Sequence, residues 1–217
     1  MSTKNRTYVI GDIHGCYDKL TDLLDKISPD SAHDTLVFLG DYIDRGPDSR
    51  KVVEKVLELQ QTFPRVIPLM GNHEQMFLAA LTGRENEFFL KMGGDATLAS
   101  YGIKPPYNRR IASEIPLTHI HFLQNLLLLW EDERYIYVHA GLEPGVHLSQ
   151  QSARWCCWAR ENFITTTYDY GKQVIFGHTP FDKPHIDPYK IGIDTGAVYG
   201  GELTCLVLPD MEFVTAK

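Results

Sequence analysis

Short apolar runs and helix-patterned segments alternate along the first third of the chain. The runs at 7–10, 35–39 and 65–70 have the length and the apolar character of short buried β-strands. A polar turn with flanking glycine follows each run, and apolar residues then recur at helical spacing. Three such β-turn-α units predict an α/β fold with right-handed crossovers, in which the ends of the strands lie side by side.

Proline-containing segments bound the first two predicted helices. The first helix has its apolar stripe at Cys16, Leu20, Leu23, Leu24 and Ile27, and Ser-Pro-Asp at 28–30 ends it. The second helix starts near Pro47 and ends at Pro64, and the third starts near residue 75.

The rest of the chain combines an irregular insert with further short elements. Residues 83–125 contain helical patches interrupted by glycine and proline pairs, and we interpret them as an insert beside the sheet. The runs 126–130 and 134–138 predict an antiparallel strand pair. The later predicted elements are a helix near 149–161 and strands at 173–176, 190–194, 202–208 and 212–215.

Composition and charge narrow the class of protein. The chain has 217 residues, 43% hydrophobic and 23% charged, which predicts one soluble globular domain over 1–217. A net charge of −7 argues against a general nucleic-acid-binding protein, which carries a basic face. The N-terminus lacks the apolar core of a signal peptide, and the longest aliphatic run, 126–129, is too short to span a membrane. Four cysteines without CxxC spacing indicate reduced thiols, so we expect a cytoplasmic protein.

Five strand ends carry the candidate chemistry. A single Asp after a strand is common in a solvated turn, but five turns that repeat a Gly-flanked pattern of acids, amides and imidazoles indicate a shared site. Imidazole, carboxylate and amide oxygen together suit manganese, iron or zinc better than calcium. The residues in these turns are Asp12, His14, Asp41, Asp44, Asn72, His73, His139 and His178.

These turns also resemble a known family. In chain order they read GDIHG at 11–15, GDYIDRG at 40–46, GNHE at 71–74, HAG at 139–141 and GHT at 177–179, and DTGAVYGGELTCL follows at 194–206. The set resembles the calcineurin-like metallophosphoesterase superfamily, and within it the short bacterial and phage-lambda type of phosphoprotein phosphatase. The resemblance spans residues 8–208 and implies the metallo-dependent phosphatase fold, a central β-sandwich of two mixed sheets flanked by helices.

The resemblance implies a two-metal site that activates water. It places Asp12 and His14 on the first metal, makes Asp41 the bridge, and places Asn72, His139 and His178 on the second metal. The expected metals are two divalent ions, Mn²⁺ before Fe or Zn. A hydroxide shared by the two metals would attack phosphorus directly, without a covalent phosphoenzyme.

The same resemblance assigns residues to proton transfer and to phosphate binding. His73 would protonate the leaving oxygen, and Asp44 would orient the His73 ring. Arg45, Arg160 and Asn72 would bind the phosphoryl group. The motif around Arg160 is loose, so a surface helix arginine paired with nearby acids such as Glu161 is the alternative.

Other polar and aromatic residues receive structural interpretations. His119, His121, His185 and Asp187 are expected to be exposed or partly packed, because no Gly-flanked strand end holds them. The pair Trp155 and Trp158 is expected to be core rather than a base-stacking platform.

The expected activity is hydrolysis of phosphoserine and phosphothreonine, with phosphotyrosine as a further substrate. The alternative is a symmetrical bis(5'-nucleosyl)-tetraphosphatase, a diadenosine tetraphosphate hydrolase that shares these motifs and releases two ADP. The short chain favours the protein phosphatase, acting as a monomer on phosphorylated proteins or peptides, over an enzyme acting on dinucleoside polyphosphates. Residues 83–118, with the loop 105–110, are expected to border the substrate. A non-catalytic protein that only binds phosphorylated partners would lack a metal ligand or the proton donor. The six ligand positions, His73, Asp44 and Arg45 are all present, which argues against that class of protein.

Overall fold

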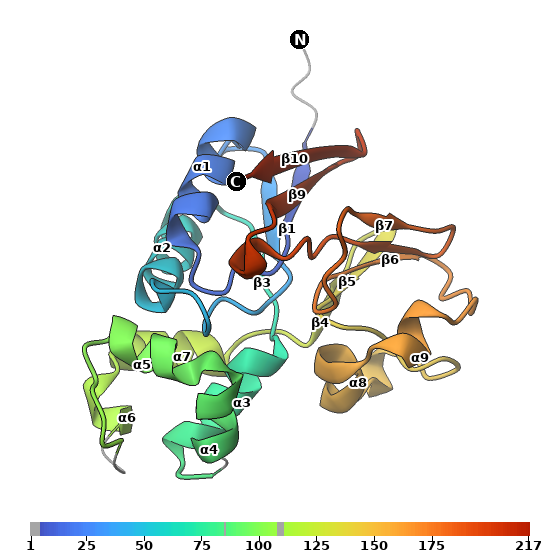
Figure 1. Ribbon diagram of the computed structural model, residues 1–217. Helices are drawn as coiled ribbons and strands as arrows, with labels where there is room; N and C mark the ends of the chain where they lie inside the picture. The colour runs from blue at the N-terminus through green and yellow to red at the C-terminus, as the bar shows by residue number, and fades with distance from the viewer. Residues whose placement is uncertain (1–4, 85, 108–110) are drawn as a thin grey trace.

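Two mixed sheets form the centre of the protein. The computed structural model describes residues 5–84, 86–107 and 111–217, and its strands group into two five-stranded sheets (Figure 1). The first sheet has the order β10-β9-β1-β2-β3 and the second β4-β5-β6-β8-β7. The strands of the first sheet are β1 (Thr7–Ile10), β2 (Thr35–Phe38), β3 (Val66–Pro68), β9 (Leu203–Leu208) and β10 (Glu212–Ala216). Those of the second are β4 (Leu129–Glu131), β5 (Tyr135–Val138), β6 (Gln173–Phe176), β7 (His185–Ile186) and β8 (Lys190–Gly192).

The two sheets pack face to face around a small apolar layer. Val9 of β1 and Val37 of β2 contribute to this layer from the first sheet, and Tyr137 of β5 and Ile175 of β6 contribute from the second. Their neighbours along each strand point to the opposite face and join the larger core under the helices. Because both faces of these strands are buried, the strands are continuous apolar runs in the sequence rather than alternating ones. The predicted α/β sandwich is confirmed.

Helices cover the outer faces of the sandwich. In Figure 1, α1 (Tyr17–Ile27) and α2 (Ser49–Thr62) lie beside the first sheet, and α8 (Ala153–Trp158) and α9 (Glu161–Ile164) lie below the second. Helix α3 (Asn72–Leu81) begins directly after β3, without a long loop. Residues 83–125 form the predicted helical insert, with α4 (Asn86–Phe89), a turn at Leu90–Gly94, α5 (Asp95–Ser100), α6 (Ile111–Glu114) and α7 (Leu117–Gln124).

Two predicted elements differ from the structure. The helix expected near 149–161 is a short 3-10 turn (Leu148–Gln150) followed by α8 and α9, because Ala159 takes an extended conformation with ψ 144°. The strand expected from 126 begins at Leu129, since Leu127 instead forms an isolated bridge with Leu69. Part of the loop 105–110, at 108–110, lies outside the described residues.

Within the described residues, no helix combines the length and the apolar character needed to cross a membrane. The four cysteines are free thiols, and three of them are buried. The assignment of residues 1–217 to a single domain stays a prediction.

Candidate metal centre

The ends of five parallel strands bring the predicted ligands together. Strands β1, β2 and β3 run parallel in the first sheet, and β5 and β6 run parallel in the second. The turns that follow them meet: the backbone N–H of His178 donates to Asp12 Oδ2 at 3.0 Å, and Asp41 Oδ2 lies 3.4 Å from His14 Nε2. All six predicted ligands are buried, each with at most 6% of its surface exposed: Asp12, His14, Asp41, Asn72, His139 and His178.

One group of three side chains surrounds the Nε2 atom of His139. The other ring nitrogen, Nδ1, donates to the Leu39 carbonyl at 2.9 Å, so Nε2 carries a lone pair in the neutral ring. That lone pair faces Asn72 Oδ1 at 3.1 Å, His178 Nδ1 at 3.2 Å and Asp41 Oδ2 at 3.5 Å. Lone pairs that face one another in the interior repel unless a cation binds between them. Asp41, His139 and His178 are placed to bind such a metal ion.

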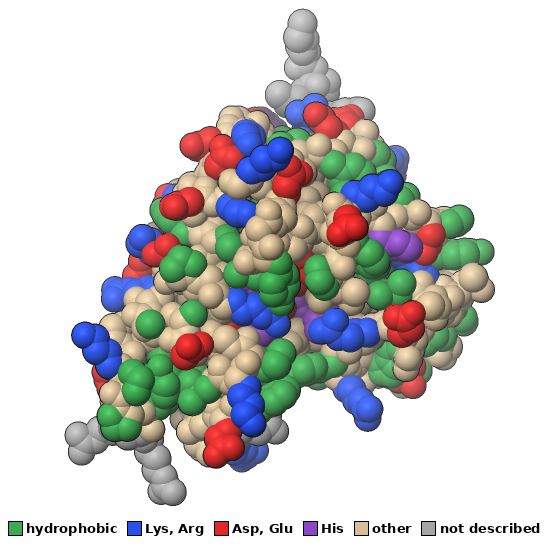
Figure 2. All heavy atoms as spheres, viewed as in Figure 1, with side chains coloured by type: hydrophobic (Ala, Val, Ile, Leu, Met, Phe, Trp, Pro, Cys, Tyr) green, Lys and Arg blue, Asp and Glu red, His purple; other side chains and the backbone are tan. Residues whose placement is uncertain are grey.

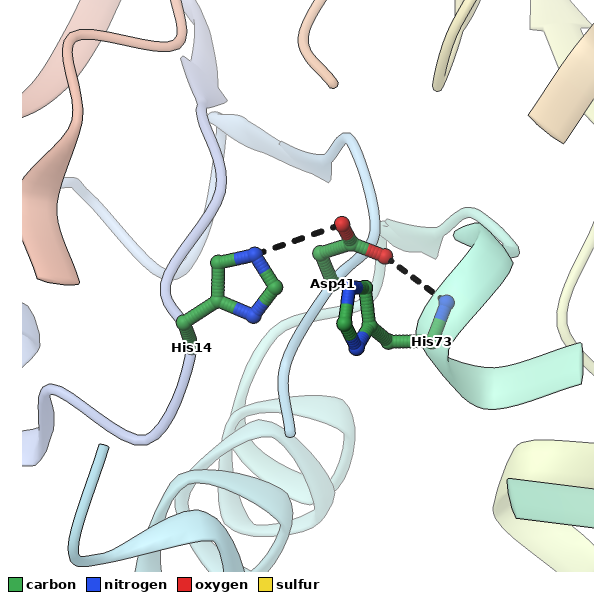
Figure 3. A group of neighbouring side chains, drawn as sticks. All are labelled: His14, Asp41 and His73. Carbon is green, nitrogen blue, oxygen red and sulfur yellow. Dashed lines mark hydrogen bonds and ion pairs between the residues drawn. The ribbon is translucent and has the colours of Figure 1, made fainter. Parts of the chain in front are cut away.

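A second group contains His14, Asp41 and His73. Figure 3 shows the two imidazole rings beside the Asp41 carboxylate. Asp41 Oδ2 faces His14, and Asp41 Oδ1 accepts the backbone N–H of His73 at 3.1 Å. His14 Nδ1 donates to the Ile43 carbonyl at 2.8 Å, so the lone pair of the neutral ring is on Nε2. These three side chains are also placed to bind a metal ion, and Asp41 belongs to both groups.

Two buried atoms at the same place have no hydrogen-bond partner among the described residues. They are Asp12 Oδ1 and His178 Nε2. An unpaired buried polar atom is costly, and a metal bond is one way to satisfy it. The donor set of imidazole nitrogens and carboxylate oxygens therefore fits divalent metal ions, as the resemblance implied.

Burial dominates the electrostatics of the site. It lowers the pKa of His14 to about 3 and that of His178 to about 2, so both rings are neutral and able to ligate near pH 7. Burial also raises the pKa of Asp12 well above its ordinary value, and the charges of Asp194 and Asp41 add to this shift. For Asp41 burial acts in the same direction, but the neighbouring histidines outweigh it and lower its pKa.

Several site residues have a left-handed backbone. Among the described residues, seven other than glycine have a positive φ, and five of them lie in these turns: His14, Asp41, Asp44, Arg45 and His178. This conformation costs free energy for a side chain with a Cβ atom, and it concentrates where function requires a fixed direction. These backbone conformations therefore lower the free energy of unfolding, and they fix the directions of the side chains in the site.

Glu74, which the motif contained but to which no role was assigned, joins two of the turns. Its buried carboxylate accepts the backbone N–H groups of Asp41 at 3.0 Å, Tyr42 at 2.9 Å and Gly71 at 2.9 Å. Both carboxylate oxygens are used as acceptors, so the side chain fixes the turn after β2 against the start of α3. Gly71 has no room for a side chain there, since a Cβ atom would lie 2.1 Å from Asp41 Oδ1.

A chain of hydrogen bonds orients His73. Its Nδ1 lies 2.6 Å from Asp44 Oδ2, as the resemblance implied. The other Asp44 oxygen accepts from the Thr97 hydroxyl at 2.6 Å, and the backbone N–H of Asp44 donates to the same hydroxyl at 2.8 Å. Thr97 belongs to α5 in the insert, and no local sequence pattern connects it to the turn 53 residues earlier.

Arg45 and Arg160 are the two arginines expected to bind phosphate, and they belong to different parts of the chain. A guanidinium nitrogen of Arg45 lies 2.5 Å from His14 Nε2, and the guanidinium packs over the exposed ring of Tyr199 at 5.4 Å. Arg160 caps α9 at the break after α8 and is exposed, so the expected continuous helix is wrong at this residue. Burial is the main cause of the lowered pKa of His139 and of His178, and the positive charge of Arg160 contributes to both shifts.

Asp194 is a further buried acid that the sequence reasoning missed. It follows β8, and its Oδ1 accepts the backbone N–H of Gly196 at 2.9 Å. Burial raises its pKa to about 6. Its position just after a strand was the available signal, but the turn has no histidine beside the acid.

Two structural interpretations need adjustment. His119 is buried and bonded to the Tyr101 hydroxyl at 2.8 Å, whereas exposure or partial packing was expected. Trp155 and Trp158 are only half-buried, so the interpretation of both as core residues is wrong. They pack against the core from its edge, because α8 ends at the surface.

Comparison with known proteins shows where the chain belongs. The model of the calcineurin-like phosphoesterase family matches residues 6–182. A protein from Bacillus cereus named bis(5'-nucleosyl)-tetraphosphatase PrpE [asymmetrical] is 30% identical over 232 residues, covering 95% of this chain and 92% of that protein.

Solved structures share the fold at lower identity. A candidate diadenosine tetraphosphatase superposes with a TM-score of 0.74 and 24% identity, covering 99% of this chain and 94% of the other. A cold-active protein-tyrosine phosphatase of a psychrophilic Shewanella species has a TM-score of 0.70 and 20% identity, covering 99% and 81%.

These relatives overturn the expected protein phosphatase activity. Two Bacillus proteins at 30% identity are named for dinucleoside tetraphosphates, and the stated alternative agrees with them better than the main prediction does. The preference for a protein phosphatase, which rested on the short chain, was wrong, because this chain covers 92% of the length of an asymmetrical tetraphosphatase from B. cereus. With its metal-binding groups, two-sheet fold and match over residues 6–182, the chain belongs to the calcineurin-like phosphoesterase family.

Proposed function

We propose that this protein hydrolyses dinucleoside tetraphosphates asymmetrically, to a nucleoside triphosphate and a nucleoside monophosphate. The observation that carries this proposal is the 30% identity to the B. cereus enzyme, over nearly the whole of both chains. The name of that relative specifies asymmetrical cleavage, whereas the alternative stated from the sequence was a symmetrical tetraphosphatase.

The proposed ligand assignment is the one that the family resemblance implies, and it agrees with the two groups of side chains in having Asp41 shared. Asp12 and His14 would hold one metal, Asn72, His139 and His178 the other, and Asp41 both. The unpaired Oδ1 of Asp12 and Nε2 of His178 support their inclusion. When bound, the two metals would activate a water molecule for attack on phosphorus and stabilise the developing charge. Mn²⁺ is the first expected metal, with Fe and Zn as alternatives.

The remaining residues would bind phosphate and move a proton. Arg45 is half-buried beside His14 and would bind phosphoryl oxygens with its planar guanidinium. Arg160 would do so from the start of α9. The amide of Asn72 would also contact the phosphoryl group. His73, held by Asp44, would donate a proton from Nε2 to the leaving oxygen.

A product assay tests the proposal. Metal-loaded protein is incubated with diadenosine tetraphosphate, and the nucleotides are separated by ion exchange. ATP and AMP in equal amounts are the expected products. Two ADP would indicate symmetrical cleavage, and faster turnover of a phosphoserine peptide assayed in parallel would contradict the proposal altogether. The monomeric state and the cytoplasmic location remain predictions.

A further inference from the structure

A pocket of about 490 Å³ lies beside the metal centre and has no assigned role. Its walls come from the loop after β5 and from α8, α9 and the break between them. We call it the tryptophan pocket, and the residues that matter here are Glu143, Arg154, Trp155, Trp158, Arg160 and Asn162. Its volume is in the range of sites for small organic ligands.

The aromatic wall is fixed in orientation before any ligand binds. The indole N–H of Trp158 donates to Gln75 Oε1 at 2.8 Å, and Gln75 is two residues beyond His73. On α4, Phe88 stacks on the Trp158 ring with centroids 6.4 Å apart and planes 25° apart. A half-buried indole with a satisfied N–H presents a rigid surface for stacking, which reduces the entropy lost on binding.

Hydrogen bonds connect this pocket to the metal centre. Arg160 lines the pocket, and Trp158 in the same wall donates to Gln75 on α3, the helix that begins with Asn72 and His73. Cys156 strengthens the connection, because its carbonyl accepts the N–H of Ala140, the residue after His139, at 2.7 Å. Figure 2 shows histidine side chains in a hollow in the middle of this face, with Lys or Arg side chains on both sides.

The chemistry of the pocket matches one end of a nucleotide. Indole rings stack on any of the nucleobases, and guanidinium groups bind phosphates. Glu143 and Asn162 supply a carboxylate and an amide at the same place, which are groups that pair with the polar edge of a base. In the described residues, this combination of aromatic surface and cationic charge adjoins the metal ligands.

We propose that the tryptophan pocket binds one nucleoside of the substrate, with its base against Trp155 and Trp158 and its first phosphate near Arg160. This inference rests on the proposed function, because it deepens the recognition of a dinucleoside polyphosphate at the same site. It predicts that the base itself contributes to affinity, and that the contribution depends on Trp158.

The test compares two ligands that differ only in adenosine. They are α,β-methylene adenosine diphosphate and methylenediphosphonate, which contain a stable P–C–P linkage. Binding to metal-loaded protein is measured by calorimetry in buffer with excess free metal. Base stacking predicts that the adenosine ligand binds about 10- to 100-fold more tightly to the wild type. Trp158→Ala should reduce this advantage to less than about threefold, whereas Trp158→Phe should retain most of it.

Two further variants distinguish a loss of adenosine binding in the pocket from a general loss of folding. Trp155→Ala provides a second change in the aromatic wall, and Tyr168→Ala removes a 43% exposed aromatic side chain that is not among the pocket-lining residues. The first should weaken adenosine binding, and the second should leave the ratio of the two affinities unchanged. Methylenediphosphonate affinity and thermal unfolding report whether each variant remains folded.

The outcomes distinguish this inference from the proposed function. Equal binding of the two ligands by the wild type, or a full adenosine advantage in Trp158→Ala and Trp155→Ala, overturns the pocket even if diadenosine tetraphosphate is hydrolysed. A Trp158-dependent advantage supports the pocket even if the wild type fails to cleave diadenosine tetraphosphate, in which case the proposed function is wrong.

Discussion

Replacing Thr97 with valine should impair catalysis without touching a metal ligand. The Thr97 side chain is fully buried, and its hydroxyl both donates to Asp44 Oδ1 and accepts from the Asp44 backbone. Valine has nearly the same shape but lacks the hydroxyl. The substitution therefore leaves Asp44 Oδ1 without this donor in the interior, while Ser49 Oγ, 3.1 Å away, still accepts the Asp44 backbone N–H.

The expected magnitude follows from the strength of a hydrogen bond to a charged group. Loss of such a bond costs about 1.5–3 kcal/mol, so urea unfolding should show a decrease of about 2 kcal/mol in the free energy of unfolding. Because Asp44 holds the ring of His73 at 2.6 Å, a displaced Asp44 also misplaces the proposed proton donor. Loss of a residue that orients a functional histidine typically costs about 10- to 100-fold, and we expect kcat to fall within that range.

The assay uses two aryl phosphates whose leaving groups differ in basicity. Phenyl phosphate needs a proton on its leaving oxygen, whereas 2,4-dinitrophenyl phosphate releases a stable anion. If Thr97 acts through Asp44 and His73, Thr97→Val should slow the phenyl ester more than the dinitrophenyl ester, and Thr97→Ser should restore most of the difference.

Thr62→Val provides the matched control, because it removes an exposed helix hydroxyl bonded to a backbone carbonyl. Equal losses of activity on the two esters, or wild-type kinetics on both, would refute this explanation of how the insert supports the site.

Three further predictions concern the metals. His73→Asn should reduce the rate by about 10²- to 10⁴-fold while elemental analysis still finds two metals per chain. Loss of one metal would instead indicate that His73 is a ligand, because His73 also belongs to the group with His14 and Asp41. Asp41→Asn should lower the occupancy of both metals, because Asp41 belongs to both groups, and retention of one fully occupied metal would contradict a shared ligand. Metal affinity should fall as the pH drops through about 6, because Asp194 then takes up a proton and the site loses a negative charge that attracts cations, whereas the pKa of His14, about 3, keeps that ring neutral. Asp194→Asn removes a charge that raises the pKa of Asp12, so calorimetric titration should find the pH dependence moved to lower pH, and an unchanged dependence would exclude this coupling.

The general fold and the convergence of the turns could be predicted because they depend on local patterns. Strands such as β1 and β2 are short apolar runs, and parallel strands joined by helices align their ends at one edge. Asp12, Asp41 and His139 each lie within a few residues of the end of such a strand, so their meeting required no knowledge of side-chain packing.

The supports of the site were decided only by the tertiary structure. Thr97 meets Asp44 because the insert folds back across the turn, where Gly93 comes so close that a Cβ atom would lie 2.8 Å from Arg45 Cγ. Contacts between residues this far apart in sequence depend on packing, and no periodicity records them. The break at Ala159 likewise removed Arg160 from its expected helix and created a wall of the tryptophan pocket.

By itself, the sequence determined the strand-and-turn framework and the residue types that suit divalent metals, since these depend on hydrophobic periodicity and on ligand chemistry. It did not determine the substrate, because family motifs describe the reacting phosphate and not what is attached to it. Recognition depends on surfaces such as the one formed by Trp155 and Trp158, whose half-exposed rings were expected in the core. Only packing in three dimensions decides which aromatic side chains remain available to a ligand, because that outcome depends on where each helix ends against its neighbours.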